Sequence, residues 1–188
     1  MDTSRILRST IPDIAAVYGG VRGRTLSSSH LGWAWQMLVE DGVKTVIELR
    51  SEDSSQWLPL KCASLGLRYF HYPVHKRGQS APQMVALFEE FCKIIDGGDF
   101  YIACAQGLHR TDIALCAYWM FYGADRGRPQ PELRGYLESE GKDLVKIFQT
   151  LNAFYRVKTE CDGGVPPIPE AVFKERKQLI KEAWKQIV

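Results

Sequence analysis

The sequence of 188 residues predicts an α/β protein with a central, mostly parallel sheet flanked by helices on both faces. Strand-like and helix-like runs alternate through residues 43–124, which is the pattern of parallel strands joined by helical crossovers. The length suits one domain with a sizeable core, and 45% hydrophobic with 24% charged residues is typical of a soluble globular chain. We therefore expect a layered fold with its ligand at the carboxyl ends of the strands.

The first half of the chain alternates between the two kinds of element. Serines at positions 27–29 are candidate helix N-caps, and Gly42 and Gly66 are placed to end helices. β-Branched and apolar residues fill 44–49, as in a buried strand. The predicted elements are a strand over 16–21, a helix over 30–40, a strand over 44–49, a short helix over 54–64 and a strand over 67–74.

The second half is richer in helices. Val85, Phe88, Cys92 and Ile95 recur at helical spacing, and two glycines follow at 97 and 98. The predicted elements are a helix over 80–95, a central strand over 99–103, and helices over 111–122, 131–139 and 143–156.

The C-terminal segment is treated as an addition to a main unit of residues 1–160. Residues 161–169 contain glycine and proline and are expected to form a loop, and an apolar stripe predicts a helix over 170–188. We expect this helix to dock on the same domain. The alternative is a helix that binds a partner or forms a dimer.

Composition and charge exclude several classes of function. A net charge of +2 gives no reason to expect nucleic-acid binding, and no apolar run is long enough to span a membrane or to serve as a signal peptide. Five cysteines without metal-like spacing indicate neither a disulfide framework nor a zinc site. We expect a cytoplasmic protein, monomeric or weakly dimeric, that needs no metal or cofactor.

The segment from Cys104 to Arg110 carries the strongest functional signal. An apolar strand-like run leads into it, and an apolar helix-like run leads out. A loop at the start of a helix directs free N–H groups and the positive end of the helix dipole at one point, which favours an anion. Arg110 adds donors matched to phosphate oxygens, and the same field stabilises a Cys104 thiolate. The pattern predicts a cysteine nucleophile beneath a bound phosphate.

Spacing alone does not identify this site, because Cys62 and Arg68 have the same separation. Cys62 falls in a helix-like stretch, and Arg68 opens the next strand. That order cannot place a helix N-terminus behind the loop, so we interpret Cys62 as a structural residue.

Gly107 to Thr111, read with the preceding cysteine, resembles the protein tyrosine phosphatase superfamily, in its dual-specificity branch. It is most similar to the atypical fungal and plant group, some of whose members cleave inositol pyrophosphates. The segments 17–22 and 42–50 resemble the entry strand and the first parallel strand of that family. The resemblance implies the cysteine-phosphatase fold, here with an extra C-terminal helix. It also implies that Thr111 hydrogen-bonds the sulfur of Cys104.

The sequence departs from that family at three points. Ala103 stands where histidine is usual, Asp112 stands where glycine is usual, and no Asp or Glu occurs between Asp53 and Glu89, where the general acid is expected. His75 is the first candidate for the missing acid and Asp112 the second. A substrate whose leaving group is phosphate would need no acid.

The remaining candidate residues are assigned to substrate binding. They are the loop residues Ala105, Gln106, Gly107, Leu108 and His109, and the basic pair Lys76 and Arg77 next to His75. The predicted function is hydrolysis of phosphate esters or phosphoanhydrides in a phosphoprotein or an inositol phosphate, through a cysteinyl phosphate. The alternative is a phosphatase-like module that binds phosphate and turns over slowly.

Overall fold

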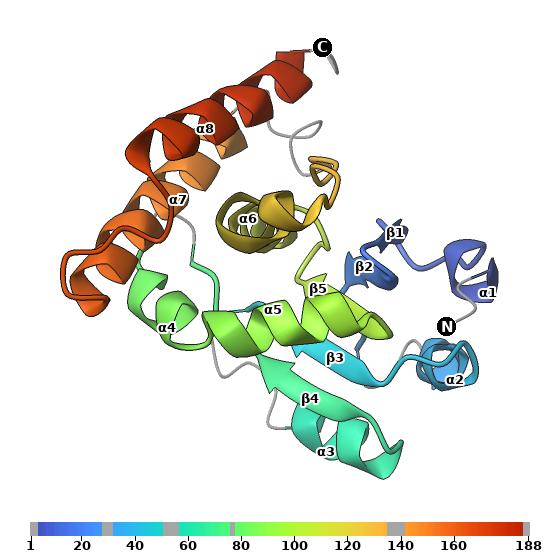
Figure 1. The fold of residues 1–188 in the computed structure, drawn as a ribbon. Coiled ribbons are helices and arrows are strands. Elements are labelled where there is room, and N and C mark those ends of the chain that lie inside the picture. Colours follow the sequence, from blue (N-terminus) through green and yellow to red (C-terminus); the bar gives the residue numbers. More distant parts are fainter. Residues whose placement is uncertain (1–3, 28–31, 51–56, 76–77, 135–141, 186–188) are drawn as a thin grey trace.

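The computed structural model describes residues 4–27, 32–50, 57–75, 78–134 and 142–185. Its centre is a five-stranded sheet in the order β1-β2-β5-β3-β4 (Figure 1). The strands are β1 (Ala15–Val17), β2 (Gly20–Arg24), β3 (Thr45–Glu48), β4 (Arg68–His71) and β5 (Phe100–Cys104). β2, β5, β3 and β4 are parallel, and β1 pairs antiparallel with β2 at the edge. The mostly parallel sheet predicted from the sequence is confirmed.

Alternate residues of the central strand β5 face two separate cores. Phe100, Ile102 and Cys104 belong to one apolar cluster, whereas Tyr101 and Ala103 belong to the other. Because side chains alternate along a strand, each cluster lies on one face of the sheet. Every residue of β5 is buried, as expected for a strand covered by helices on both faces.

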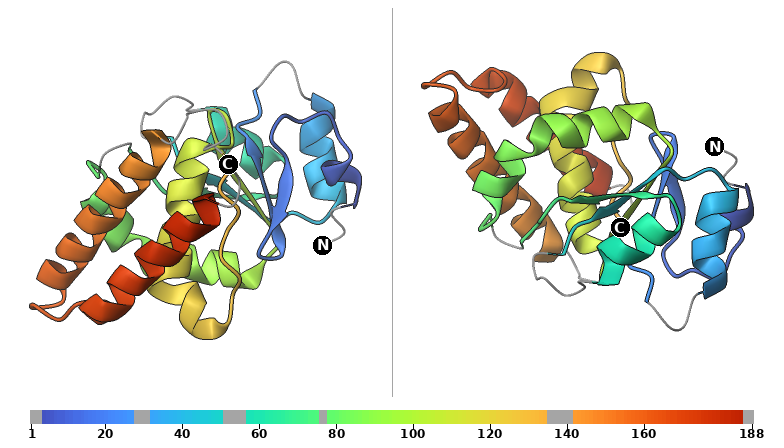
Figure 2. Two further views of the ribbon diagram at one scale, coloured as in Figure 1. Left: turned by 90° about the horizontal axis from the view of Figure 1, so that it is seen from above. Right: turned by 90° about the horizontal axis from the view of Figure 1, so that it is seen from below.

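The helices divide between these two faces, as the views along the sheet show (Figure 2). Residues of α1, α2 and α3 contribute to the core that contains Tyr101, and residues of α4 to α8 to the core that contains Cys104. The helices are α1 (Ser4–Leu7), α2 (Gly32–Glu40), α3 (Trp57–Ser64), α4 (Ala81–Ala86), α5 (Phe88–Gly97), α6 (His109–Tyr118), α7 (Lys142–Cys161) and α8 (Glu170–Lys185). None of these described helices has the length and apolar character needed to cross a membrane.

The single strand predicted over 16–21 is wrong, because a tight turn divides it into β1 and β2. Tyr18 and Gly19 both have positive φ, at 49° and 81°. Two positive φ angles in succession characterise the hairpin turn whose twist matches that of the flanking strands. Tyrosine is an unusual residue for such a position, so the turn was not predicted.

The predicted helix over 80–95 is interrupted at Leu87, whose φ of −100° and ψ of 1° separate α4 from α5. The predicted helix over 111–122 starts earlier, at His109, and continues beyond Tyr118 as a π-helical turn η1 (Trp119–Gly123) and a 3₁₀ turn η2 (Ala124–Arg126). These changes adjust helix direction without altering the order of elements.

The helix predicted over 131–139 is wrong in its described part, since residues 131–134 form neither helix nor strand. Leu133 is buried, and Arg134 donates a hydrogen bond to the carbonyl of Ile14 at 3.1 Å. These contacts hold the segment against the β1–β2 hairpin. Residues 135–139 lie outside the described part of the chain.

Helix α8 lies beside α7 and packs into the core formed by residues 1–160 (Figure 1). Ile180 is fully buried, and Phe173 stacks on Tyr155 of α7 with ring centroids 4.4 Å apart. Arg176 is also buried and donates hydrogen bonds to the carbonyl of Met120 and the carboxylate of Asp125. These contacts place apolar and polar groups of α8 directly against α7 and η1.

We predict that Ile180→Ala lowers the free energy of unfolding by about 2–5 kcal/mol, because truncating a buried isoleucine leaves a cavity in the core. The adjacent Leu179 is 41% exposed, so Leu179→Ala should cost much less. Urea denaturation of both variants measures the difference. Equal losses, or a separate early transition for the C-terminal helix, would contradict docking on one cooperative unit.

Candidate active site

Cys104 is the last residue of β5, and α6 begins five residues later at His109. The strand, loop and helix therefore follow in the order that the phosphate-binding interpretation requires. A small cavity of about 90 Å³ opens at this point. It is lined by Cys104, Ala105, Gln106, His109 and Arg110.

The sulfur of Cys104 has a hydroxyl partner. Thr111 Oγ1 lies 3.5 Å from Cys104 Sγ and donates to it, and both residues are buried. A donated hydrogen bond stabilises the anionic form of its acceptor relative to the neutral form. The contact is the one that the resemblance implied for this threonine.

Arg110 lies in the first turn of α6 and lines the cavity with Cys104. Its Nε is buried, and no acceptor in the described part of the chain lies within hydrogen-bonding distance of that atom. A buried donor of this kind normally has a partner. An anion in the cavity would supply one, and a guanidinium matches phosphate oxygens in shape and charge.

Gly107 allows the loop to pass close to β2. Its φ is +73°, and a Cβ atom at this position would lie 2.4 Å from the carbonyl carbon of Gly23 and 2.8 Å from the amide nitrogen of Arg24. Both atoms belong to backbone, which cannot move aside as a side chain can. The backbone geometry and the lack of space thus both require glycine here.

Arg22 fixes the outer side of the loop and was not identified from the sequence. This residue of β2 is 2% exposed. Its Nη2 donates to the carbonyls of Gly107 at 2.9 Å and Leu108 at 3.3 Å, and its Nη1 donates to the carbonyl of Glu132 at 3.0 Å. The buried guanidinium of Arg22 therefore donates to loop carbonyl groups that would otherwise be buried without a hydrogen-bond partner.

Asp112 completes this arrangement and is not placed as a general acid. Its Oδ1 accepts a hydrogen bond from Arg22 Nη2 at 2.6 Å, and the side chain is 2% exposed. It does not line the cavity that contains Cys104. The geometry gives no support to the expected role of Asp112 as a general acid, and that role stays a prediction. Asp112 positions the loop.

Arg24 is a second arginine that sequence reasoning missed. It pairs with Cys104 in the parallel β2–β5 register, and its Nε donates to the carbonyl of Ala105 at 3.1 Å. Unlike Arg22, it is exposed. The spacing of arginines in β2 gave no sign of either contact, because the partners are more than 80 residues away in the sequence.

The other predicted substrate residues differ in position. Gln106 and His109 line the cavity, whereas Leu108 is buried and offers only its backbone. His75 is partly buried, and its backbone N–H donates to Ser80 Oγ at 2.7 Å. No described contact joins His75 to the cavity. Lys76 and Arg77 lie outside the described residues.

Cys62, the competing cysteine, has a different environment. It is fully buried within α3, and its Arg68 counterpart lies on β4 in an ion pair with Glu90. Burial, and to a lesser degree the charge of Glu48, raises the pKa of the Cys62 thiol to about 11. Such a thiol is protonated and unreactive at neutral pH. Within the described ranges, no group of three His, Cys, Asp or Glu side chains is arranged to hold a metal ion.

A sequence model of the family described as "DSP-PTPase phosphatase fused to NAD+ Kinase" matches residues 16–146, which include β2 to β5 and the whole loop. No curated protein sequence matches the chain.

A solved structure of low sequence identity shares the fold, and a second is less similar. A DUF442 protein from Shewanella putrefaciens CN-32 superposes with a TM-score of 0.53 at 16% identity, covering 87% of this chain and 96% of that one. The core catalytic domain of the PP-IP phosphatase SIW14 from S. cerevisiae gives a TM-score of 0.49 at 15% identity, covering 94% and 97%. At such identities the first of these structures supports the fold alone.

We predict that Arg22→Met and Asp112→Asn each lower the free energy of unfolding by about 3–5 kcal/mol, because each leaves a buried charge without its partner. The double variant Arg22→Met/Asp112→Leu should be more stable than either single variant. Urea denaturation measures all three. Arg156→Met is the control, since the side chains of Arg156 and its partner Glu160 are 75% and 66% exposed, and it should cost at most about 1 kcal/mol. Single variants as stable as this control would show that the buried pair does not hold the loop.

Proposed function

Because the chain belongs to the family of dual-specificity-type phosphatase domains described as fused to NAD+ kinase, we propose that it is a cysteine-dependent phosphatase. Its substrates would be phosphate esters or phosphoanhydrides, in a phosphoprotein or an inositol phosphate. Cys104 would be the nucleophile. Arg110 and the backbone amides of residues 105–110 would bind the transferring phosphoryl group.

One observation carries this proposal. The thiol of Cys104 and the guanidinium of Arg110 line the same small cavity, at the junction of β5 with the N-terminus of α6. A thiol, a helix N-terminus and a guanidinium thus lie together, as phosphoryl transfer to a cysteine would require. The unpartnered Nε of Arg110 gives a further reason to place an anion there.

The reaction would proceed in two displacements at phosphorus. In the first, a sulfur–phosphorus bond forms between the Cys104 thiolate and the phosphoryl group while the bond to the leaving oxygen breaks. In the second, water attacks phosphorus, the sulfur–phosphorus bond breaks, and inorganic phosphate and the thiolate are released. The Thr111 hydroxyl would stabilise the thiolate at both ends of this cycle. Arg110 and the loop amides would hold the three non-bridging oxygens.

The leaving oxygen needs a proton when the substrate is an alkyl phosphate, so the source of that proton decides which substrates react. Asp112 is committed to Arg22, so His75 is the remaining candidate acid among those considered from the sequence. The chain would then either use an imidazole or depend on substrates whose leaving group needs no proton. In the second case, activated aryl phosphates and phosphoanhydrides would be the better substrates.

A phosphate-binding module without turnover is the alternative. The departures at Ala103 and in the acid loop favour it, since both remove groups that assist catalysis in the family that the sequence resembles. The presence of Cys104 next to Arg110 favours the enzyme, because binding alone has no need of a thiol.

We predict that Cys104→Ser abolishes hydrolysis of an aryl phosphate, while Cys62→Ser, a change of equal size in a buried helix, retains it. Turnover is measured by phosphate release, after circular dichroism has established that both variants fold. Tungstate binding to Cys104→Ser should persist, because Arg110 and the loop amides remain. Loss of turnover in both folded variants would sink the assignment of the nucleophile, and absence of turnover in the wild type would favour the binding module.

We also predict a strong preference for good leaving groups. An aryl phosphate or a phosphoanhydride should be hydrolysed at least about a hundredfold faster than a phosphoserine peptide, the range that general acid catalysis supplies. His75→Ala should slow the phosphoserine reaction and leave the anhydride reaction unchanged if His75 is the acid. Rapid phosphoserine hydrolysis that survives both His75→Ala and Asp112→Asn would contradict this account.

A further inference from the structure

Helices α7 and α8 carry two neighbouring cavities that the proposed reaction does not use. One, of about 270 Å³, is lined by Phe148 of α7 and by residues of α8, namely Lys174, Lys177, Gln178 and Lys181. The other, of about 540 Å³, is lined by residues of α7, namely Gln149, Asn152, Ala153 and Arg156. Lys177 Nζ donates to Asn152 Oδ1 at 2.9 Å and so joins the two linings. We call these two cavities together the α7–α8 groove.

The groove is positively charged. Three lysines and one arginine line it, and none of the described residues that line it is acidic. Glu170 pairs with Lys174 at 2.7 Å and Glu160 approaches Arg156 at 3.9 Å, but all four side chains are more than 60% exposed. Exposed pairs of this kind contribute little and are screened by salt. The lining itself thus holds four cations and no acid, in a chain whose net charge is +2.

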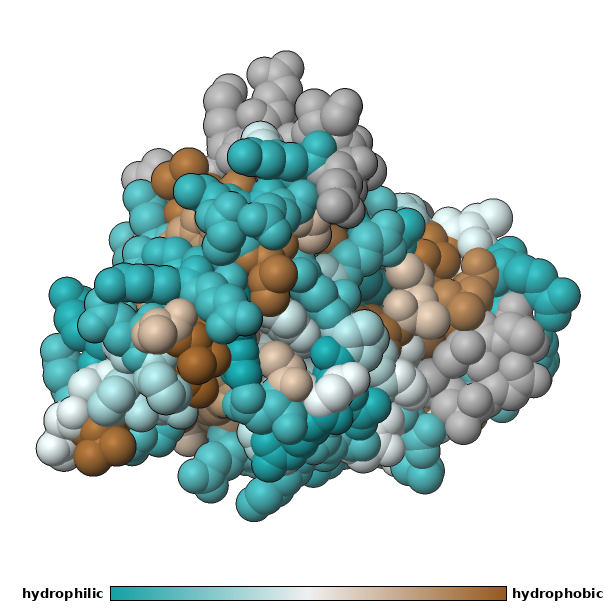
Figure 3. All heavy atoms as spheres, turned by 45° about the horizontal axis from the view of Figure 1, so that its top comes forward, coloured by the Kyte–Doolittle hydropathy of each residue, from teal (hydrophilic) through white to brown (hydrophobic). Residues whose placement is uncertain are grey.

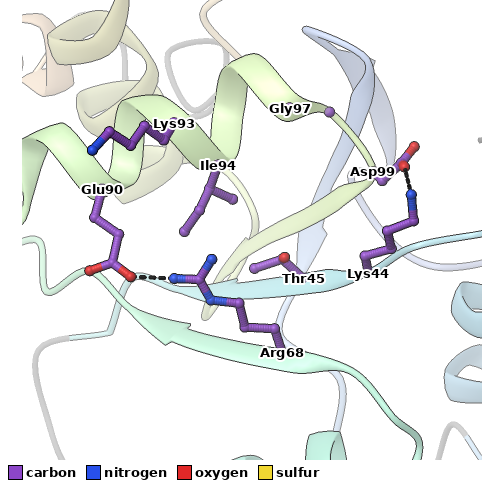
Figure 4. A pocket seen from close by; sticks show the side chains of 9 residues that line it. Lys44, Thr45, Arg68, Glu90, Lys93, Ile94, Gly97 and Asp99 are labelled. Atoms are coloured by element: carbon purple, nitrogen blue, oxygen red, sulfur yellow. Dashed lines mark hydrogen bonds and ion pairs between the residues drawn. The ribbon is translucent and has the colours of Figure 1, made fainter.

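Another large cavity, outside the α7–α8 groove, has acidic as well as basic side chains in its lining. It has a volume of about 560 Å³ and lies at the amino ends of the strands beneath α5 (Figure 4). There Lys44 is paired with Asp99 at 2.7 Å, and Arg68 is paired with Glu90. Glu90 and Asp99 themselves line that cavity, whereas Glu170 and Glu160 lie outside the lining of the α7–α8 groove. The described lining of the groove therefore holds cations without acids.

Lys177 provides independent support, because it lies in the middle of the groove. Its ammonium group is placed over the rings of Phe148 at 5.4 Å and Phe173 at 5.2 Å, and the residue is partly buried. Desolvation, and to a lesser degree the neighbouring charge of Lys181, lowers the pKa of Lys177 below its usual value. An anion bound beside it would relieve this unfavourable burial of positive charge.

We propose that the α7–α8 groove binds an acidic polypeptide segment of another protein. The lysines recur at positions i, i+3 and i+7 of α8, so they lie on one side of the helix and span about 10 Å. Alternate side chains of an extended peptide are about 7 Å apart, so two or three acidic residues in a short stretch can reach all three lysines. The face that carries α8 is mostly hydrophilic and has only small apolar patches (Figure 3), which suits a charged partner better than membrane insertion.

The test is fluorescence anisotropy with a labelled decapeptide of alternating Glu and Ser, against a Gln and Ser peptide of the same length. We expect binding of the acidic peptide that weakens as salt rises from about 0.05 M to about 0.5 M. Lys174→Gln/Lys177→Gln/Lys181→Gln should weaken it by about tenfold or more. The matched control Lys44→Gln/Lys61→Gln/Lys93→Gln removes the same charge elsewhere and should change it by less than about twofold. Equal loss in the two triple variants would overturn the proposal.

A milder variant and three other anionic ligands complete the experiment. If the triple variant does not fold, Lys174→Gln/Lys181→Gln leaves the Lys177 contacts in place and should still weaken binding several-fold. A single-stranded oligonucleotide, vesicles containing phosphatidylserine, or tripolyphosphate that bind through these lysines while the acidic peptide does not would overturn the proposal. Cys104→Ser should bind the peptide as the wild type does, so failure here and failure of the proposed phosphatase activity are distinguishable.

Discussion

The buried guanidinium of Arg22 is the contact on which the geometry of the candidate site depends. A loop that turns its amide groups toward a bound anion directs carbonyl groups outward, where buried carbonyls need donors. Arg22 supplies donors to Gly107 and Leu108 and neutralises Asp112 at the start of α6. The carbonyl groups of Gly107 and Leu108 thus have hydrogen-bond partners without a bound ligand. Such preorganisation lowers the cost of binding an anion.

Helix α6 is held at both ends by arginines that are remote in sequence. Arg22 binds near its N-terminus, and Arg176 of α8 donates to the carbonyl of Met120 in the π-helical turn that continues it. Phe121 of the same π-helical turn stacks on Phe154 and Phe173, with ring centroids 4.7 and 5.8 Å apart. The C-terminal helix therefore supports the same element that carries Arg110, which gives α8 a structural connection to the site as well as a charged outer face.

Local features of the fold were predictable from the sequence, and remote ones were not. The strand, loop and helix around Cys104 follow from neighbouring residues. The turn at Tyr18 was missed because tyrosine rarely takes positive φ, and the segment at 131–134 because its partners Arg22 and Ile14 lie more than 100 residues away. The ion pair of Asp112 with Arg22 was also not predicted, because the two residues are 90 positions apart and no sequence pattern links them. Asp112 was therefore considered for acid catalysis.

The division of β5 between two cores has a consequence for how this site can evolve. Cys104 faces the layer that contains α6, and its neighbour Ala103 faces the opposite layer. Deleting or inserting one residue within β5 would exchange these directions, because side chains alternate along a strand. The thiol of Cys104 would then point toward α2 and α3, away from Thr111 and Arg110, with its chemical identity unchanged. The position of Cys104 in the alternation of β5 therefore matters as much as the cysteine itself. Only an insertion outside β5 leaves the direction of this side chain unchanged.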